Sequence, residues 1–236
     1  MAQIIPSTNL FIITSALDTG IGIIGAKDRL DQTIATLENL KQKVPNAAVL
    51  LVDGSPNKVS EETKQKISEY TQAIFWNDPD IFAMASSGRK SEAEIIMVFK
   101  TLLLFKQNPQ MMKFFYSIKR IFKYSARSAL NNDFDISKYD NLHGRYVFKT
   151  AIPSWMDENR KKNVTDHLYI TRFYSLCPSL LDNYLQTLQP ILNNVIQHGI
   201  DTEHSHYLCL DRRLVTEFDT LGVEGIMGGT GLKETY

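Results

Sequence analysis

Cysteine is scarce in this chain of 236 residues, which contains only Cys177 and Cys209. Two cysteines in no metal-ligand spacing argue against a disulfide framework and against a structural zinc site. The composition therefore predicts a protein of a reducing compartment, and we expect the cytoplasm.

Net charge and long apolar runs are also missing. The 26 basic residues balance the 26 acidic ones, so no overall field recruits nucleic acid or an anionic membrane. No stretch approaches the roughly 20 apolar residues that span a bilayer, because Lys100 interrupts the apolar segment IIMVFKTLLLF. We therefore expect no nucleic-acid partner and no membrane span. The hydrophobic content of 43% is enough to form a buried core.

Strand-like and helix-like segments alternate along the first half of the chain. This order predicts an α/β fold, a Rossmann-like, mixed and mostly parallel sheet flanked by helices in a single compact domain over residues 1–236. Short apolar segments predict strands at 11–17, 47–53, 71–77, 113–119, 145–150 and 167–176. Helical patterns begin at residues 28, 60, 91 and 180, the last with a kink or interruption at Pro190 and an end at Gly199, and the glycine-rich tail 222–236 is predicted to be mobile.

Ligands in open α/β sheets bind beyond the carboxyl ends of the strands. Asp53 ends the predicted strand 47–53, where its carboxylate can accept hydrogen bonds from a base or a ribose. Asp also forms turns readily before a Gly-Ser-Pro sequence such as Gly54-Ser55-Pro56. Both interpretations of Asp53 stay open.

The loop after the first predicted strand contains Gly20-x-Gly22-x-x-Gly25, which nominally matches a dinucleotide fingerprint. That fingerprint needs its glycines in the tight turn directly after the strand, and here the loop to the next helix is too long. A flexible loop over a nucleotide fits the spacing better than a nicotinamide or flavin site. We expect no organic cofactor.

Two polar segments stand at predicted helix starts. Arg89-Lys90-Ser91 precedes a helix whose N-terminal amides would attract phosphate, although a solvated turn with Ser91 as an ordinary N-cap explains it equally well. Glu203-His204-Ser205-His206 lacks the spacing of a zinc site, and its carboxylate is a candidate general base. A polar helix start is the alternative.

The segment RIFKYSARSALNNDFDISKYD, residues 120–140, offers two ways to manage the charge of a diphosphate. Asp133-Phe134-Asp135 has the Asp-x-Asp form that many sugar-transferring enzymes use to hold a divalent metal. Lys123 and Arg127 are fixed cations that would serve the same purpose. Asp133 can also simply cap a turn, with Phe134 in the core.

Taken in order, several segments resemble GT-A-fold nucleotide-sugar glycosyltransferases, and the likeness covers nearly the whole chain. The resemblance is to a bacterial and phage glycosyltransferase-like group with the patterns Lys-Ser-x-x-Glu, Lys-x-Ser/Thr-Gly-Arg-Tyr and Ile-Glu-His. The segments are FIITSAL, DRLDQTIATLENLKQKVPNAAVLLVDGSP, RKSEAE, FKYSARSALNNDFD, GRYVF, HLYITRFYS, DTEHSHYL and GVEGIMGGTG. Ala126 and Ser128 depart from the Gly and Tyr of the second pattern, and Thr202 replaces the Ile of the third.

The resemblance implies a hexosyltransferase-like enzyme that moves a sugar from a UDP- or GDP-sugar to a hydroxyl of a glycan or other acceptor, in a bacterial cell or a phage-infected host. It implies Glu203 and His204 as catalytic residues, with Glu203 as the base, and Mn²⁺ or Mg²⁺ at Asp133 and Asp135. The donor-binding residues that it implies are Ser15, Asp53, Ser55, Lys90, Ser91, Lys123, Ser125 and Arg127.

Two other functions remain compatible with the sequence. The short segment after Glu203 and the degenerate motifs favour a non-catalytic nucleotide- or carbohydrate-binding module, or a minimal transferase that needs a partner. The glycine pattern leaves a dinucleotide-dependent oxidoreductase as the weaker alternative. Oligomeric state has no signature in the sequence.

Overall fold

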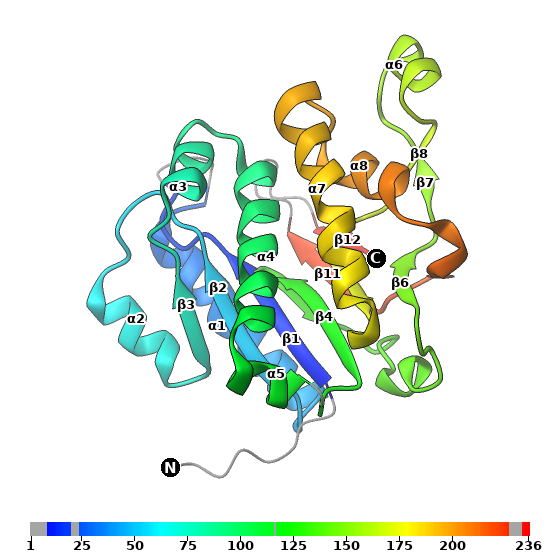
Figure 1. Ribbon diagram of the computed structural model, residues 1–236. Helices are drawn as coiled ribbons and strands as arrows, with labels where there is room; N and C mark the ends of the chain where they lie inside the picture. The colour runs from blue at the N-terminus through cyan, green and yellow to red at the C-terminus, as the bar shows by residue number, and fades with distance from the viewer. Residues whose placement is uncertain (1–8, 20–23, 116, 227–232) are drawn as a thin grey trace.

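The computed structural model describes residues 9–19, 24–115, 117–226 and 233–236. Seven strands form one sheet in the order β10-β6-β9-β4-β1-β2-β3 (Figure 1). Neighbouring strands are parallel except where β9 runs antiparallel to β4 and β6. The strands are β1 (Asn9–Ser15), β2 (Ala48–Asp53), β3 (Gln72–Phe75), β4 (Arg120–Ser125), β6 (Tyr146–Lys149), β9 (Phe173–Leu176) and β10 (Val215–Phe218). The predicted mixed, mostly parallel sheet is confirmed.

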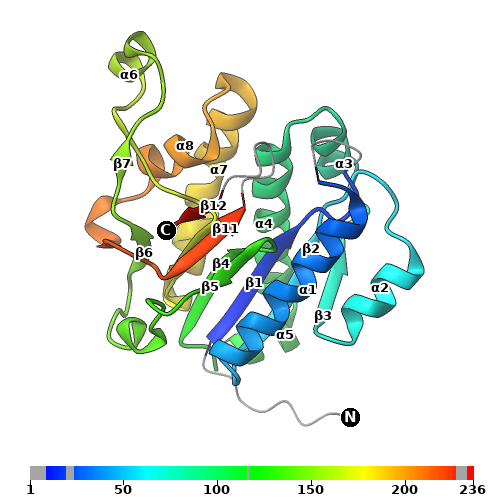
Figure 2. The same cartoon turned by 180° about the vertical axis from the view of Figure 1, so that it is seen from behind.

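Helices cover both faces of this sheet in a single compact domain. Helices α4 and α7 lie over one face (Figure 1), and α1 lies over the other together with a small sheet of β5, β11 and β12 (Figure 2). The helices are α1 (Ala26–Lys43), α2 (Glu61–Ser68), α3 (Pro79–Ser86), α4 (Lys90–Gln107), α5 (Pro109–Phe115), α6 (Glu158–Asn163), α7 (Leu181–His198) and α8 (Thr202–Cys209). The short strands are β5 (Ser128–Leu130), β7 (Ile152–Pro153), β8 (His167–Leu168), β11 (Val223–Ile226) and β12 (Lys233–Thr235), and 3-10 turns occur at Ile136–Tyr139, Pro178–Leu180 and Arg212–Leu214.

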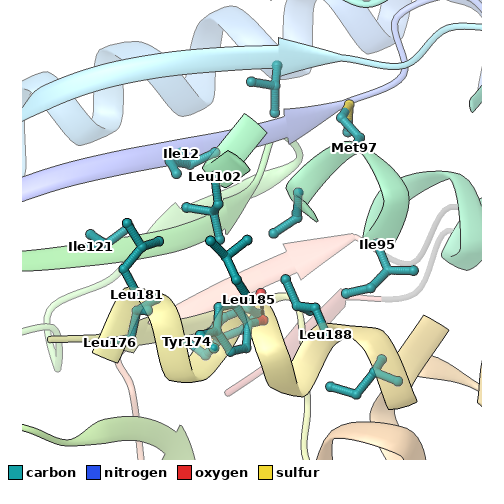
Figure 3. Packing of buried hydrophobic residues seen from close by; sticks show 14 of the residues in the cluster. Ile12, Ile95, Met97, Leu102, Ile121, Tyr174, Leu176, Leu181, Leu185 and Leu188 are labelled. Atoms are coloured by element: carbon teal, nitrogen blue, oxygen red, sulfur yellow. Dashed lines mark hydrogen bonds between the residues drawn. The ribbon is translucent and has the colours of Figure 1, made fainter. Parts of the chain in front are cut away.

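The core is divided by the sheet into two clusters, because successive strand residues point to opposite faces. Ile12 packs toward α4 and α7, against Leu102 and Leu185 (Figure 3). Phe11 points the other way and stacks on Phe122 with 4.5 Å between ring centroids. Both faces of β1 and β4 are therefore buried, as the continuous apolar run of β1 predicts.

The predicted strand 113–119 is wrong, since α5 ends at Phe115 and the strand beside β1 is β4. Asn108 begins the helix, because its side chain accepts hydrogen bonds from the amides of Gln110 and Met111. The sequence of β4 was overlooked because it carries Arg120 and Lys123, yet both side chains are buried. Arg120 donates to Ser175 Oγ and to two backbone carbonyls, which satisfies its charge inside the protein.

Other boundaries also differ from the sequence prediction. Asp78-Pro79 does not merely end a strand, because the Asp78 carboxylate caps α3, a helix that the sequence reading missed. The predicted strand 167–176 is divided into β8 and β9. Helix α7 continues through Pro190, so of the predicted kink or interruption the interruption is wrong, and Gly199 ends the helix in the left-handed conformation as expected.

The glycine-rich tail contains two strands in its described part. β11 pairs with β5 and with β12, and Tyr236 is only 3% exposed. Residues 227–232 lie outside the described part, so mobility of the tail stays a prediction. Across the described residues, no helix is both long enough and apolar enough to cross a membrane.

Candidate active site

A cavity of about 300 Å³ opens where β1 and β4 end. The predicted residues Ser15, Lys90, Ser91, Ser125, Arg127 and Glu203 all line it, although they come from four separate parts of the chain. Arg29, Glu94, Thr171 and Arg172 line it as well. A more open groove between α6 and α8 contains none of the predicted residues. The cavity lies at the carboxyl ends of parallel strands, where α/β folds bind ligands.

Three cations crowd one part of this cavity. Burial lowers the pKa of Lys90, and the positive charges of Arg29 and Arg127 lower it further. Burial likewise lowers the pKa of Arg127, with added repulsion from Arg29 and Arg172. Nη1 of Arg127 is buried, and no described residue accepts its hydrogen bond. Mutual repulsion and an unsatisfied donor are both relieved by an anion in the cavity.

Helix α4 begins at this cation cluster. Arg89 occupies its N-cap position and forms no side-chain capping hydrogen bond, so Ser91 is not the N-cap that the sequence offered as the alternative. The amides of the first turn carry the positive end of the helix dipole. Lys90 and Ser91 lie in that turn and line the cavity. The helix start therefore adds to the affinity for an anion.

Asp53 is buried beneath the cavity rather than exposed in it. One carboxylate oxygen, Oδ2, accepts hydrogen bonds from Ser15 Oγ at 2.5 Å and from the Leu17 amide at 2.9 Å, and Oδ1 accepts one from the Ser55 amide at 3.0 Å. Ser55 Oγ in turn accepts a hydrogen bond from the Asp18 amide. Asp53 and Ser55 thus tie together the loops that follow β1 and β2. Neither residue belongs to the cavity lining.

Lys123 also lies below the cavity surface, with its side chain only 5% exposed. Its ammonium is 2.7 Å from Glu94 Oε1 and donates to the Thr171 carbonyl at 2.9 Å. Burial alone would raise the pKa of Glu94, but Lys123 and the Thr14 hydroxyl outweigh it and lower that pKa. Lys123 therefore neutralises a carboxylate of the cavity wall.

Glu203 lies in the first turn of α8, which Asp201 caps by accepting the His204 amide. Its Oε1 accepts from the Thr171 hydroxyl at 3.0 Å, and its Oε2 accepts from the Thr202 hydroxyl at 2.8 Å. Burial raises the pKa of Glu203, and the negative charge of Asp201 adds to this. A carboxylate with a raised pKa is a stronger proton acceptor when it is ionised.

His204 does not reach the cavity. The ring is completely buried, and its two nitrogens lie 2.7 Å from Asp201 Oδ1 and 2.7 Å from Ser154 Oγ. Trp155 packs edge-on against it. His204 therefore holds the start of α8 in place and so orients the turn that carries Glu203.

Asp133 and Asp135 lie away from the cation cluster. Lys43, at the end of α1, donates to Asn132, whereas Arg29 near the start of α1 lines the cavity. Lys43 follows Arg29 by fourteen positions, which corresponds to about 21 Å of helix. Asp135 caps the 3-10 turn Ile136–Tyr139. The structure does not bring the Asp-x-Asp pair to the cavity.

Sequence reasoning overlooked Arg29, Thr171 and Arg172. The sequence pattern that could have indicated Arg29 is its position beside the apolar stripe of α1. In the structure its side chain is only 4% exposed. Thr171 and Arg172 occupy the turn between β8 and β9, inside a segment that the sequence predicted as one strand. Gly20 and Gly22 of the glycine pattern lie outside the described residues, and Gly25 precedes α1 as its N-cap.

The sheet order, the antiparallel β9 and the cavity at the strand ends define a GT-A-like architecture. No protein-family model and no curated protein sequence matches the chain. Among solved structures, core-mannan synthase A from Aspergillus fumigatus, in its Mn/GDP form, matches 92% of this chain and 74% of its own with a TM-score of 0.50 and 11% identity. At this identity the likeness shows a shared fold.

Two further solved structures are similar at lower scores. A glycosyltransferase involved in the glycosylation of the major capsid of PBCV-1 has a TM-score of 0.45 and 8% identity, over 89% of this chain and 81% of its own. A 4-diphosphocytidyl-2C-methyl-D-erythritol synthase from Anaerococcus prevotii has a TM-score of 0.46 and 12% identity, over 98% and 93%.

Proposed function

We propose that this protein is a glycosyltransferase that moves a sugar from a nucleoside-diphosphate sugar to a hydroxyl of a glycan. The observation that carries the proposal is a single cavity in which a cluster of cations, Arg29, Lys90 and Arg127, shares the wall with the carboxylate of Glu203. Sugar transfer needs both features, because the leaving diphosphate gains charge while the acceptor hydroxyl loses a proton.

Each step has a residue in place for it. The acceptor oxygen attacks the anomeric carbon, and the bond from that carbon to the diphosphate oxygen breaks. Glu203 takes the hydroxyl proton, and the electron pair of the broken bond stays on the diphosphate. The cation cluster and the first turn of α4 stabilise that charge. Thr171 and His204 hold Glu203 and its helix in position.

The described residues around the cavity offer few ligands to a divalent metal. Oε1 of Glu94 is engaged by Lys123 and Thr14 while its Oε2 accepts from no described residue, and both oxygens of Glu203 accept hydrogen bonds from hydroxyls. No group of three or more His, Cys, Asp or Glu suited to a metal ion occurs in the described part of the chain. Mn²⁺ or Mg²⁺ at Asp133 and Asp135 stays a prediction of the sequence pattern, and no step above depends on a metal.

Donor binding and turnover test the proposal separately. UDP- and GDP-sugars are screened by thermal shift and by donor hydrolysis, with and without manganese, since one similar structure was solved in a Mn/GDP form. We expect at least one donor to raise the melting temperature. Stabilisation by none of them contradicts the proposal.

Substitution of the base separates an enzyme from a binding module. We expect Glu203→Gln to lower the rate of transfer about 100-fold or more while donor binding is kept, because general-base catalysis contributes about 10²- to 10⁴-fold. Asp166→Asn, at an exposed position in the groove beside α6, is the matched control. A non-catalytic binding module predicts donor binding without any transfer that depends on Glu203.

A further inference from the structure

The carboxylate of Glu94 has one oxygen engaged and one open. Oε1 accepts a hydrogen bond from the Thr14 hydroxyl at 2.6 Å and lies 2.7 Å from the Lys123 ammonium. No described residue donates to Oε2, although the side chain lines the cavity and is about one-third exposed. Fixed on one side and unsatisfied on the other, the carboxylate is ready to accept hydrogen bonds from a ligand.

Glu94 also lies between the cation cluster and the carboxylate of Glu203. It follows Lys90 by four residues in α4, so the two side chains share a face about 6 Å apart along the helix axis. On its other side, Lys123 joins Glu94 to the Thr171 carbonyl, and the Thr171 hydroxyl contacts Glu203. A sugar that joins a diphosphate at Lys90 to an acceptor at Glu203 must therefore pass beside Glu94.

We propose that Oε2 of Glu94 accepts hydrogen bonds from hydroxyl groups of the donor's sugar and so selects a sugar with free hydroxyls on that side. The assignment rests on the proposed function, because it takes the cation cluster as the diphosphate site. A neutral hexose suits Glu94, since its hydroxyls donate to an ionised carboxylate, and hydrogen bonds of this kind are the stronger ones. A sugar without the facing hydroxyl covers Oε2 of Glu94 and leaves it without a hydrogen-bond donor.

Calorimetric titration tests the assignment with two ligands, a nucleoside diphosphate and the same nucleotide carrying its hexose. In the wild type we expect the hexose to strengthen binding. We expect Glu94→Gln to weaken binding of the sugar nucleotide about tenfold or more and to leave binding of the free nucleoside diphosphate within about twofold, since one hydrogen bond to a charged group has that magnitude. Unchanged binding of the free nucleotide shows that the variant folds.

Matched variants and analogues isolate the contact. Glu92→Gln lies on the same helix but pairs with Arg89, and it should change neither titration. Deoxy-hexose donors complete a double-mutant cycle. The analogue that lacks the contacted hydroxyl should bind the wild type weakly and lose little more in Glu94→Gln.

Two outcomes contradict the assignment in distinguishable ways. If Glu94→Gln weakens both ligands by the same factor, or neither, Glu94 does not contact the sugar and the proposed function stands. If the wild type binds no nucleoside diphosphate, the diphosphate site itself is wrong and the proposed function fails with it.

Discussion

At the scale of single residues, the buried charges distinguish the predicted set of site residues from the residues that line the cavity. The sequence placed Lys123 and Asp53 in contact with the donor, and the structure places both beneath the cavity with their charges satisfied by neighbours. Residue type and spacing predict that a charged group stands at a strand end. They do not predict its partner, because Glu94 and Thr171 come from distant parts of the chain. Arg127 and Glu203, in contrast, were predicted and do line the cavity.

The Thr171 hydroxyl should control the pH dependence of transfer. It donates to Glu203 Oε1 and so lowers the pKa of Glu203, which burial and Asp201 raise. The Tyr236 phenol also lies near this carboxylate. Glu203 must be ionised to accept a proton. Thr171→Val removes the hydrogen bond and raises the pKa of Glu203, so the acidic limb of kcat/KM should move to higher pH. Measured pH profiles check this.

Thr171→Ser is the matched control, since it keeps the hydroxyl and should restore the wild-type profile. A Thr171→Val profile that falls at all pH values without moving would show that Thr171 has only a packing role. The amide and carbonyl of residue 171 are the same in all three proteins, so the Lys123 contact with the carbonyl is kept.

At the scale of elements, α4 links the core to the candidate site. Its middle packs on the sheet (Figure 3), and its first turn lines the cavity. The sequence predicted this helix from an apolar pattern on almost every face, and the structure confirms it. It missed α3 and α5, because the capping residues Asp78 and Asn108 precede prolines that look like breaks in the pattern. At both positions a side-chain cap starts a helix that the spacing of apolar residues alone does not predict.

Leu102→Ala should lower the free energy of unfolding by about 2–5 kcal/mol, the usual cost of a large cavity in a core. Leu102 is 1% exposed between α4 and the sheet. Leu103→Ala is the matched control, because its side chain is only partly buried, and it should cost clearly less. Urea denaturation followed by circular dichroism compares the two, and equal losses would contradict the packing described for α4.

Gly222 is required where the tail packs on the chain near Asp133. Its φ is +68°, and a Cβ at this position would lie 2.1 Å from the Phe134 amide nitrogen. Gly222→Ala should therefore cost about 2–5 kcal/mol, from the left-handed backbone and from the clash together. Gly144→Ala has the same sign of φ, at +61°, but nothing within 4 Å, so it should cost only about 1–2 kcal/mol. Thermal unfolding of both variants measures the difference.

At the scale of the whole molecule, the order of strands and helices determined which parts of the fold could be predicted from the sequence. Alternating elements predicted the layered, mostly parallel sheet, which is confirmed. The sequence could not show that β5 and β11 pair on the α1 face, because neither short strand has a strong apolar pattern and they lie far apart in the chain. It also could not show that the segment with Asp133 lies outside the cavity lining and beside Gly222, which is distant in the chain.

The chain has no net charge, yet several cationic side chains lie together in the wall of its cavity. This cluster predicts how donor binding depends on salt. Affinity for a nucleoside diphosphate should fall as sodium chloride rises from 50 to 500 mM, while affinity for the uncharged nucleoside should stay nearly constant. Titrations at several salt concentrations measure both slopes. Arg127→Met should flatten the first slope, and an unchanged slope would remove Arg127 from the diphosphate site.

The pairing of β5 with β11 has a consequence for synthesis of the protein. Ser128 is paired with Gly225, and Tyr236 packs in the same cluster as Leu130 and Tyr139. A ribosome-bound chain that has already completed β1, β2 and β4 still lacks the strand that covers β5. Until residues 223–236 emerge, that apolar surface is open to chaperones or to aggregation. The small sheet is therefore expected to form only after β11 and Tyr236 have left the ribosome.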